Sequence, residues 1–115
     1  MDIEALQQRL AAFAAERDWE QFHSPKNLVM ALAGEAGELV EVFQWLTETE
    51  SANLDAAQKE AAAHELADVL IYLVRLADRL EIDLDLAVSE KLRINAEKYP
   101  VALAKGSAKK RHLRD

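Results

Sequence analysis

The sequence predicts an all-α protein whose four helices form an antiparallel bundle. Of its 115 residues, 50% are hydrophobic, whereas only three are glycine and two are proline. Ala, Leu and Glu, which favour helices, are abundant, and apolar residues recur with the helical period. The length suits one domain with one core. We assign residues 1–100 to this domain and residues 101–115 to a basic, flexible tail.

The first half of the chain is expected to hold two helices. Apolar residues at helical spacing predict the first helix over residues 3–17. Residues 18–23 then form a connector. Ser24 is a good N-cap and Pro25 fits the first helical position, so a second helix should begin there and run to about Leu46.

A third helix is expected after a loop. Residues 47–53 are polar, which favours a loop. Asp55 with Gln58 three positions later resembles a capping box, and the third helix should run from there to about Leu80.

The fourth helix is expected to begin at a cap formed by Asp83 or Asp85 and to end near Tyr99, where Pro100 stops it. The connections between the predicted helices are short, so helices that follow each other should lie antiparallel.

The composition excludes several classes of protein. Without cysteine there is no disulfide, thiolate nucleophile or Cys-based zinc site. No apolar run approaches the ~20 residues of a membrane span and no signal peptide is evident, so we expect a cytoplasmic protein without membrane contact. Residues 101–115 carry five basic residues and one acidic residue, a net charge of +4. The whole chain has a net charge of −7, so residues 1–100 carry −11. Such an acidic body does not favour a nucleic acid polymer as partner.

Acidic residues interrupt the apolar stripe of the second helix. The stripe continues through Leu28, Leu32, Leu39 and Val42, and its one skipped position is Glu35. Glu38 lies one turn further on, close enough for both carboxylates to reach one point. Gly34 and Gly37 bracket the pair, which indicates close approach by a ligand or backbone, or simple helix contact.

The third helix repeats this pattern with Glu65 and Asp68, in a segment that is otherwise almost wholly apolar. Two antiparallel helices would bring both pairs into one cluster. Two like charges ~4 Å apart repel by roughly 4 kcal/mol, so protons or cations must neutralise the cluster. Magnesium prefers such oxygen ligands and keeps positions open for phosphate. The alternative is that these residues are solvated helix faces. Glu41 continues the spacing, either beside the metal ligands or merely solvated.

The sequence matches the motifs of di-iron and zinc sites less well than those of a magnesium site. A di-iron bundle requires Glu-x-x-His on two helices, which this chain lacks. The run from His64 to Asp68 resembles a zinc-protease helix without its second histidine, and only three histidines are present in all.

The acid pairs and their flanks resemble a known family. GEAGELVEVFQW (34–45) and ELADVLIYLVRLA (65–77) resemble the MazG-like superfamily of all-α nucleoside triphosphate pyrophosphohydrolases. ERDWEQFHSPKNL (16–28) and KLRINAEKYP (91–100) are most similar to its dCTP pyrophosphatase branch. The resemblance implies Mg²⁺-dependent hydrolysis, with Mn²⁺ as a substitute, of a nucleotide such as dCTP to its monophosphate and pyrophosphate. It also implies a homodimer or homotetramer that clears surplus or non-standard nucleotides.

The resemblance also implies roles for individual residues. The metal ligands would be Glu35, Glu38, Glu65 and Asp68, and Glu38 or Glu41 would accept a proton from the attacking water. The candidate substrate-binding residues are His23, Asn27, Trp45, Tyr72, Lys91, Asn95, Lys98 and Tyr99. Asn95 lies on a helical row with Val88 and Leu92, so it should face inward, and Trp45 should continue the row of Glu38 and Val42.

Other interpretations remain open. Trp45 and Tyr72 would serve equally as core residues, and Lys98 as a solvated lysine. Residues 96–97 are Ala-Glu where the dCTP branch tends to be basic, and the loop between the acidic helices is short. The same reaction on dUTP or an oxidised purine nucleotide is therefore an alternative, as is a non-enzymatic helical interaction module.

Overall fold

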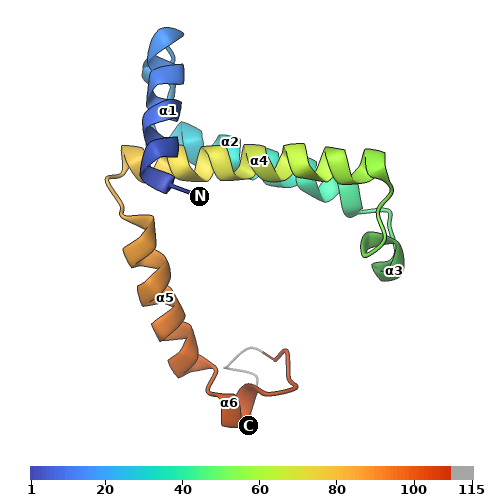
Figure 1. Ribbon diagram of the computed structural model, residues 1–115. Coiled ribbons are helices and arrows are strands. Elements are labelled where there is room, and N and C mark those ends of the chain that lie inside the picture. Colours follow the sequence, from blue (N-terminus) through green and yellow to red (C-terminus); the bar gives the residue numbers. More distant parts are fainter. Residues whose placement is uncertain (110–115) are drawn as a thin grey trace. The chain divides into compact units, whose positions relative to one another are not determined.

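The computed structural model describes residues 1–109, and every regular element in that range is a helix (Figure 1). The long helices are α1 (Ile3–Glu16), α2 (Pro25–Phe43), α4 (Ala56–Arg79) and α5 (Leu84–Lys98). The short ones are η1 (Glu20–Phe22), α3 (Glu48–Ser51) and α6 (Val101–Ala104). The predicted all-α class is confirmed. None of these helices is both long enough and apolar enough to cross a membrane.

The predicted capping residues begin three of the long helices. Ser24 Oγ accepts a hydrogen bond from the Asn27 amide at 3.2 Å, which caps α2. At α4 the predicted capping box is complete: Asp55 Oδ1 accepts from the Gln58 amide at 2.8 Å, and Gln58 Oε1 accepts from the Asp55 amide at 3.0 Å. Asp83 caps α5. These side chains satisfy amide groups that have no partner inside the helix.

Two sequence predictions about residues 44–53 are wrong. Helix α2 ends at Phe43, so residues 44–46 leave the helix three residues early. The predicted loop also contains α3, because Thr47 and Glu50 form a capping box of their own, with hydrogen bonds of 3.1 and 2.9 Å. This capping box supplies partners for the first amides of α3, so a short helix forms where the sequence predicted only a loop.

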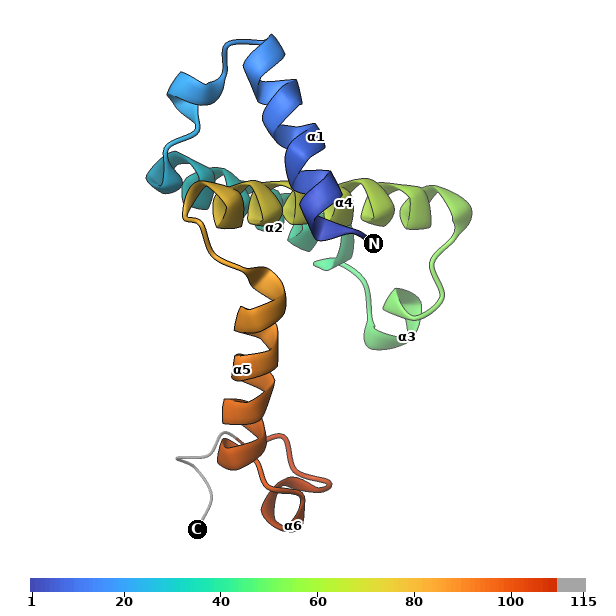
Figure 2. The ribbon, with the colours of Figure 1, turned by 60° about the vertical axis from the view of Figure 1, so that its left-hand side comes forward.

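The chain forms two compact units, Met1–Glu81 and the part that begins at Ile82. In the first unit α2 and α4 lie side by side and antiparallel, and α1 crosses α4 (Figures 1 and 2). The buried apolar residues of this unit are Ala14, Leu28, Ala62, Val74 and Ala77. Three of them are alanines, which lets the helices approach closely. The antiparallel pair sets the inward row of α2 directly opposite that of α4.

The second unit contains α5 and α6. Asn95 is half-buried, but Val88 and Leu92 on its row are 55% and 63% exposed. The row predicted to face inward is therefore largely open. Residues 101–104 of the predicted tail form α6, and residues 110–115 lie outside the described residues.

Gly34 and Gly37, which directly precede the two acids of α2, do not mark a crowded contact. A Cβ atom placed on Gly34 or Gly37 would meet no atom within 4 Å. Helix contact within residues 1–109 therefore does not explain them.

Candidate metal centre

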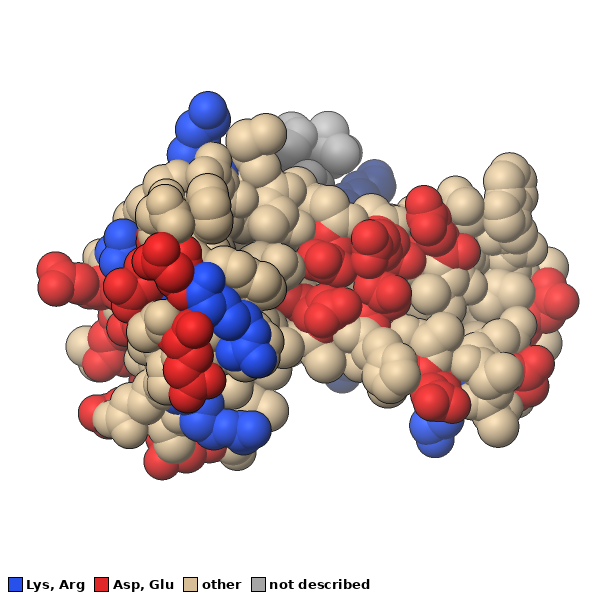
Figure 3. Space-filling model, turned by 90° about the horizontal axis from the view of Figure 1, so that it is seen from above, with Lys and Arg blue, Asp and Glu red and all other residues tan. Residues whose placement is uncertain are grey.

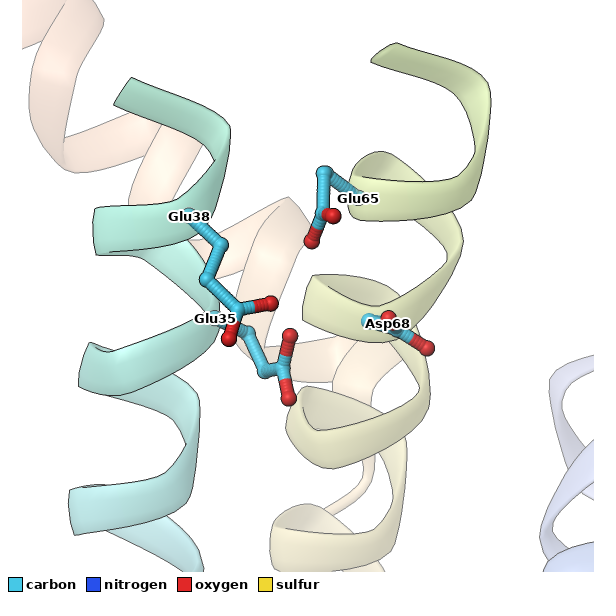
Figure 4. A group of neighbouring side chains, drawn as sticks. All are labelled: Glu35, Glu38, Glu65 and Asp68. Atoms are coloured by element: carbon cyan, nitrogen blue, oxygen red, sulfur yellow. The ribbon is translucent and has the colours of Figure 1, made fainter. Parts of the chain in front are cut away.

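Helices α2 and α4 bring four carboxyl groups together. Glu35 and Glu38 project from α2 toward Glu65 and Asp68 on α4 (Figure 4). One carboxylate oxygen from each residue lies within 4.8 Å of those from the other three. The predicted cluster therefore exists, and it depends on both the spacing of three within each helix and the antiparallel pairing between them.

The cluster is only partly solvated. Glu35, Glu65 and Asp68 are half-buried, whereas Glu38 is exposed. Glu35 Oε2 and Glu65 Oε2 are buried and lack a hydrogen-bond partner. A buried carboxylate oxygen without a partner is unfavourable, so each of these atoms requires a proton or a cation.

The pKa values reflect this environment. Burial raises the pKa of Glu35, and the adjacent Glu38 carboxyl and the charges of Asp68 and Glu65 raise it further. Burial likewise raises the pKa of Glu65, together with the carboxyls of Glu38 and Asp68 and against a smaller opposing effect of His64. The folded chain therefore holds protons at this site more tightly than a free glutamate would.

No lysine or arginine among the described residues forms an ion pair with the cluster. The ion pairs within residues 1–109 involve Glu16, Asp78, Glu90 and Glu97 as the acids, and none of them belongs to the cluster. Figure 3 shows acidic side chains gathered on the face formed by α2 and α4. Hard oxygen donors, two unpartnered buried oxygens and uncompensated charge together fit a divalent cation such as Mg²⁺.

A cavity of about 230 Å³ adjoins the cluster. Its lining combines two of the acids with mostly apolar and aromatic side chains from α1, the connector and α4. The lining residues are Leu10, Phe13, Trp19, His23, Glu35, Asp68, Ile71, Tyr72 and Arg75. A largely apolar cavity with a few polar groups is typical of a small-molecule site.

Aromatic rings form one wall of this cavity. Phe13 and Trp19 meet edge to face with centroids 5.8 Å apart, and the Trp19 and His23 rings lie 6.4 Å apart. The Arg17 guanidinium lies over the Phe13 ring, 3.5 Å from its centroid. Such rings offer flat faces on which a planar ligand can stack.

The structure brings only some of the predicted substrate residues to this cavity. His23 and Tyr72 line it together with Glu35 and Asp68. Asn27 does not; its side-chain amide instead donates to the Phe22 carbonyl at 3.1 Å and so holds the connector.

The role predicted for Trp45 stays a prediction. Trp45 lies two residues beyond the end of α2 and is 87% exposed in the single chain. Glu38 on the predicted row is exposed as well, so exposure alone does not place Trp45 off that row. In the single chain Trp45 does not line the cavity.

The remaining predicted residues are untested by this geometry. Glu41 is exposed on α2 and is not one of the four clustered acids. Lys91, Asn95, Lys98 and Tyr99 belong to the second unit, so their contacts with a substrate remain predictions.

Sequence reasoning missed Trp19, Phe13 and Arg75. Trp19 and His23 are four residues apart, a spacing that a helical connector would bring onto one side. Arg75 is the one basic residue in the apolar run after Asp68. A charge in such a run is a usable signal, because burial of a charge requires partners.

Comparison with known proteins agrees with this geometry. Residues 31–112 match the MazG-like family. The chain is 53% identical over 110 residues to human dCTP pyrophosphatase 1 and 54% identical over 108 residues to the mouse protein of that name. These alignments cover 94% and 92% of the chain but only 65% and 64% of the relatives, so the chain spans less than two thirds of their length.

A solved structure is also similar. The crystal structure of a pyrophosphatase from Archaeoglobus fulgidus superposes with a TM-score of 0.80 at 40% identity, covering 84% of this chain and 91% of the archaeal one. With the family match extending over most of the sequence and over both acid pairs, the chain belongs to the MazG-like family.

Proposed function

We propose that this chain is a metal-dependent nucleoside triphosphate pyrophosphohydrolase that converts dCTP, or a modified dCTP, to the monophosphate and pyrophosphate. One observation carries the proposal: two buried, unpartnered carboxylate oxygens belong to a four-acid cluster that borders an aromatic cavity. The relatives named dCTP pyrophosphatase 1 support this choice of substrate.

Glu35, Glu38, Glu65 and Asp68 would hold the cation, with Mg²⁺ as the natural ion and Mn²⁺ as a substitute. The bound ions would neutralise phosphate oxygens and lower the pKa of the attacking water. Glu38 is the more exposed member of the cluster and Glu41 lies one turn away, so either would accept the proton.

The cavity would take the base. Its border with Glu35 and Asp68 would direct the triphosphate toward the metal ligands, while Trp19 and Tyr72 would contact the base or sugar. Stacking gains ~1–3 kcal/mol for any base, so it provides affinity without selectivity. Selectivity requires a polar group at the base edge, and His23 is placed to supply it.

A panel of dCTP, dUTP, dTTP, dATP, dGTP and CTP tests the substrate, with monophosphate and pyrophosphate resolved as products. We expect dCTP to have the highest kcat/KM. Trp19→Ala should raise KM for every nucleotide, because it removes a stacking face, and His23→Ala should change the ranking. Phe22→Ala is the matched control, since Phe22 is an exposed aromatic residue of the same connector that does not line the cavity.

The panel also decides between this proposal and its alternatives. Purine nucleotides that lead by roughly tenfold would exclude the pyrimidine assignment, because that ratio corresponds to a well-formed edge contact of ~1.4 kcal/mol. If dUTP has the highest kcat/KM, the chain catalyses the same reaction on another base. If no nucleotide is hydrolysed with either Mg²⁺ or Mn²⁺, a non-enzymatic helical interaction module is the better explanation.

We also propose that the chain works as a homodimer or homotetramer. Large apolar side chains on α2 and α4 are open to solvent in the single chain: Val29 50%, Met30 63%, Val40 57% and Leu66 57% exposed. Exposed apolar area of this kind is a common mark of an interface. Light scattering after size exclusion should give two or four times the chain mass of 12.9 kDa. A monomer at micromolar concentration would contradict self-association.

A further inference from the structure

Arg75 is a buried charge that the metal cluster does not use. It lies on α4 between Val74 and Leu76, and only 5% of its surface is exposed. Arg75 also belongs to the lining of the cavity beside the acids. A buried guanidinium is stable only if its donors have partners, so the identity of those partners indicates what it does.

Two of its nitrogens have partners on different elements. Arg75 Nη1 donates to Asp78 Oδ2 at 3.4 Å, one turn further along α4. Arg75 Nε donates to His23 Nδ1 at 3.3 Å, across 52 residues of sequence. Asp78 thus orients the guanidinium, and the guanidinium in turn contacts one ring nitrogen of His23.

This contact determines which nitrogen of His23 can carry a proton. A guanidinium has donors but no acceptor, so the nitrogen that faces it must be unprotonated. In a neutral imidazole the proton then lies on Nε2. Burial lowers the pKa of His23, and the charges of Arg75 and Arg79 lower it further against an opposing effect of Glu20, which keeps the ring neutral near pH 7.

We propose that Arg75 is a positioning residue that locks His23 in the Nε2–H tautomer, so that His23 offers a hydrogen-bond donor to an acceptor atom of the base. The ligand in this inference rests on the proposed function, whereas the tautomer does not. The Arg75 contact occupies Nδ1, and Nε2 is the nitrogen left for a ligand in the cavity.

The Nε2–H tautomer of His23 determines which hydrogen-bonding edge of a base it can pair with. An Nε2–H group pairs with a lone pair, such as ring N3 of cytosine, and is mismatched with the N3–H of uracil or thymine. Without Arg75 the ring would exchange between two tautomers, one of which would present an acceptor instead. Discrimination between dCTP and dUTP would then fall.

Arg79 provides a matched control. Its Nε also contacts His23, but it donates to the backbone carbonyl at 3.2 Å rather than to the ring. It lies four residues after Arg75 on the same helix and also lowers the pKa of His23. Arg79→Met therefore removes a nearby positive charge and a His23 contact without freeing Nδ1.

The decisive measurement is nitrogen NMR of the free protein at neutral pH, with His23 assigned by its loss in His23→Gln. The parent should show a single Nε2–H tautomer, with scalar coupling between Arg75 Nε and His23 Nδ1 across the hydrogen bond. Arg75→Met should give a mixture of tautomers, and Arg79→Met should keep the single one. An Nδ1–H ring in the parent would overturn the proposal without any variant, as would an unchanged tautomer in folded Arg75→Met.

The kinetic counterpart is the ratio of kcat/KM for dCTP to that for dUTP. One neutral hydrogen bond contributes about 0.5–1.5 kcal/mol, so Arg75→Met should lower the ratio roughly two- to tenfold, while Arg79→Met leaves it near the parent value. An unchanged ratio in an Arg75→Met protein that has lost the single tautomer would overturn the link to the base. If the parent hydrolyses no nucleotide, the proposed function fails, yet the NMR spectrum still decides the tautomer.

Discussion

Asp68→Asn is expected to abolish nucleotide hydrolysis while leaving the fold intact. Asp68 contributes one of the four clustered carboxylates and also borders the cavity, so it lies where metal ligands and substrate would meet. Asn keeps the shape of the side chain but removes its charge. Loss of one group that stabilises a transition state typically costs about 10²–10³ in kcat, and we expect at least that loss here.

The measurement is kcat for dCTP with saturating Mg²⁺, together with circular dichroism to check the fold. Glu60→Gln is the matched control, because Glu60 is an exposed acid on the same helix and is not part of the cluster. It should retain parent activity, and EDTA should reduce the parent to the level of Asp68→Asn. Hydrolysis by Asp68→Asn at the parent rate would show that the acids serve another purpose.

Mg²⁺ is expected to raise the thermal stability of the folded chain. A cation that binds only the folded chain stabilises it by about 2.7 kcal/mol at a hundredfold excess over Kd. For a domain of this size that free energy should raise Tm by roughly 10 °C. Glu35→Gln should raise the metal-free Tm, because it removes a charge whose buried Oε2 lacks a partner, and should reduce the response to Mg²⁺.

The difference in metal-free Tm between Glu35→Gln and the parent should depend on pH in one direction. Because the folded pKa of Glu35 is raised above its ordinary value of 4.5, its contribution to stability is fully present below pH 4.5 and is lost as pH rises through the folded pKa. In EDTA, the Tm advantage of Glu35→Gln over the parent should therefore widen as pH increases from 4.5. His23, whose lowered pKa acts in the opposite direction, is present in both proteins and cancels in the comparison.

Thermal melts in EDTA and in Mg²⁺, at several pH values, check these expectations. Glu60→Gln again serves as the control and should follow the parent under every condition. A parent Tm that does not respond to Mg²⁺ would mean that the four acids do not form a binding site. A constant difference between parent and Glu35→Gln across pH would contradict the raised pKa.

The sequence by itself determined the helical class, the helix starts and the acid pairs. Each of these depends on residues close together in the chain. Ser24 and Asp55 cap the amides three residues later, and the spacing of three in Glu35–Glu38 and Glu65–Asp68 fixes each pair on one helix face. Such short-range relations can be read without knowing what packs against the helix.

Only the tertiary structure decided the surroundings of the acids. Helix α2 ends at Phe43 and a capping box at Thr47 begins a new helix, whereas the sequence predicted one helix to about Leu46 followed by a loop. The crossing of α1 over α4 brought Phe13 and Trp19 to the cavity, and the contact of Arg75 with His23 joins residues 52 positions apart. The helical period specifies which face a side chain occupies. Which distant side chain meets that face depends on helix crossing and on the paths of the connectors, and these are set by packing of the whole unit.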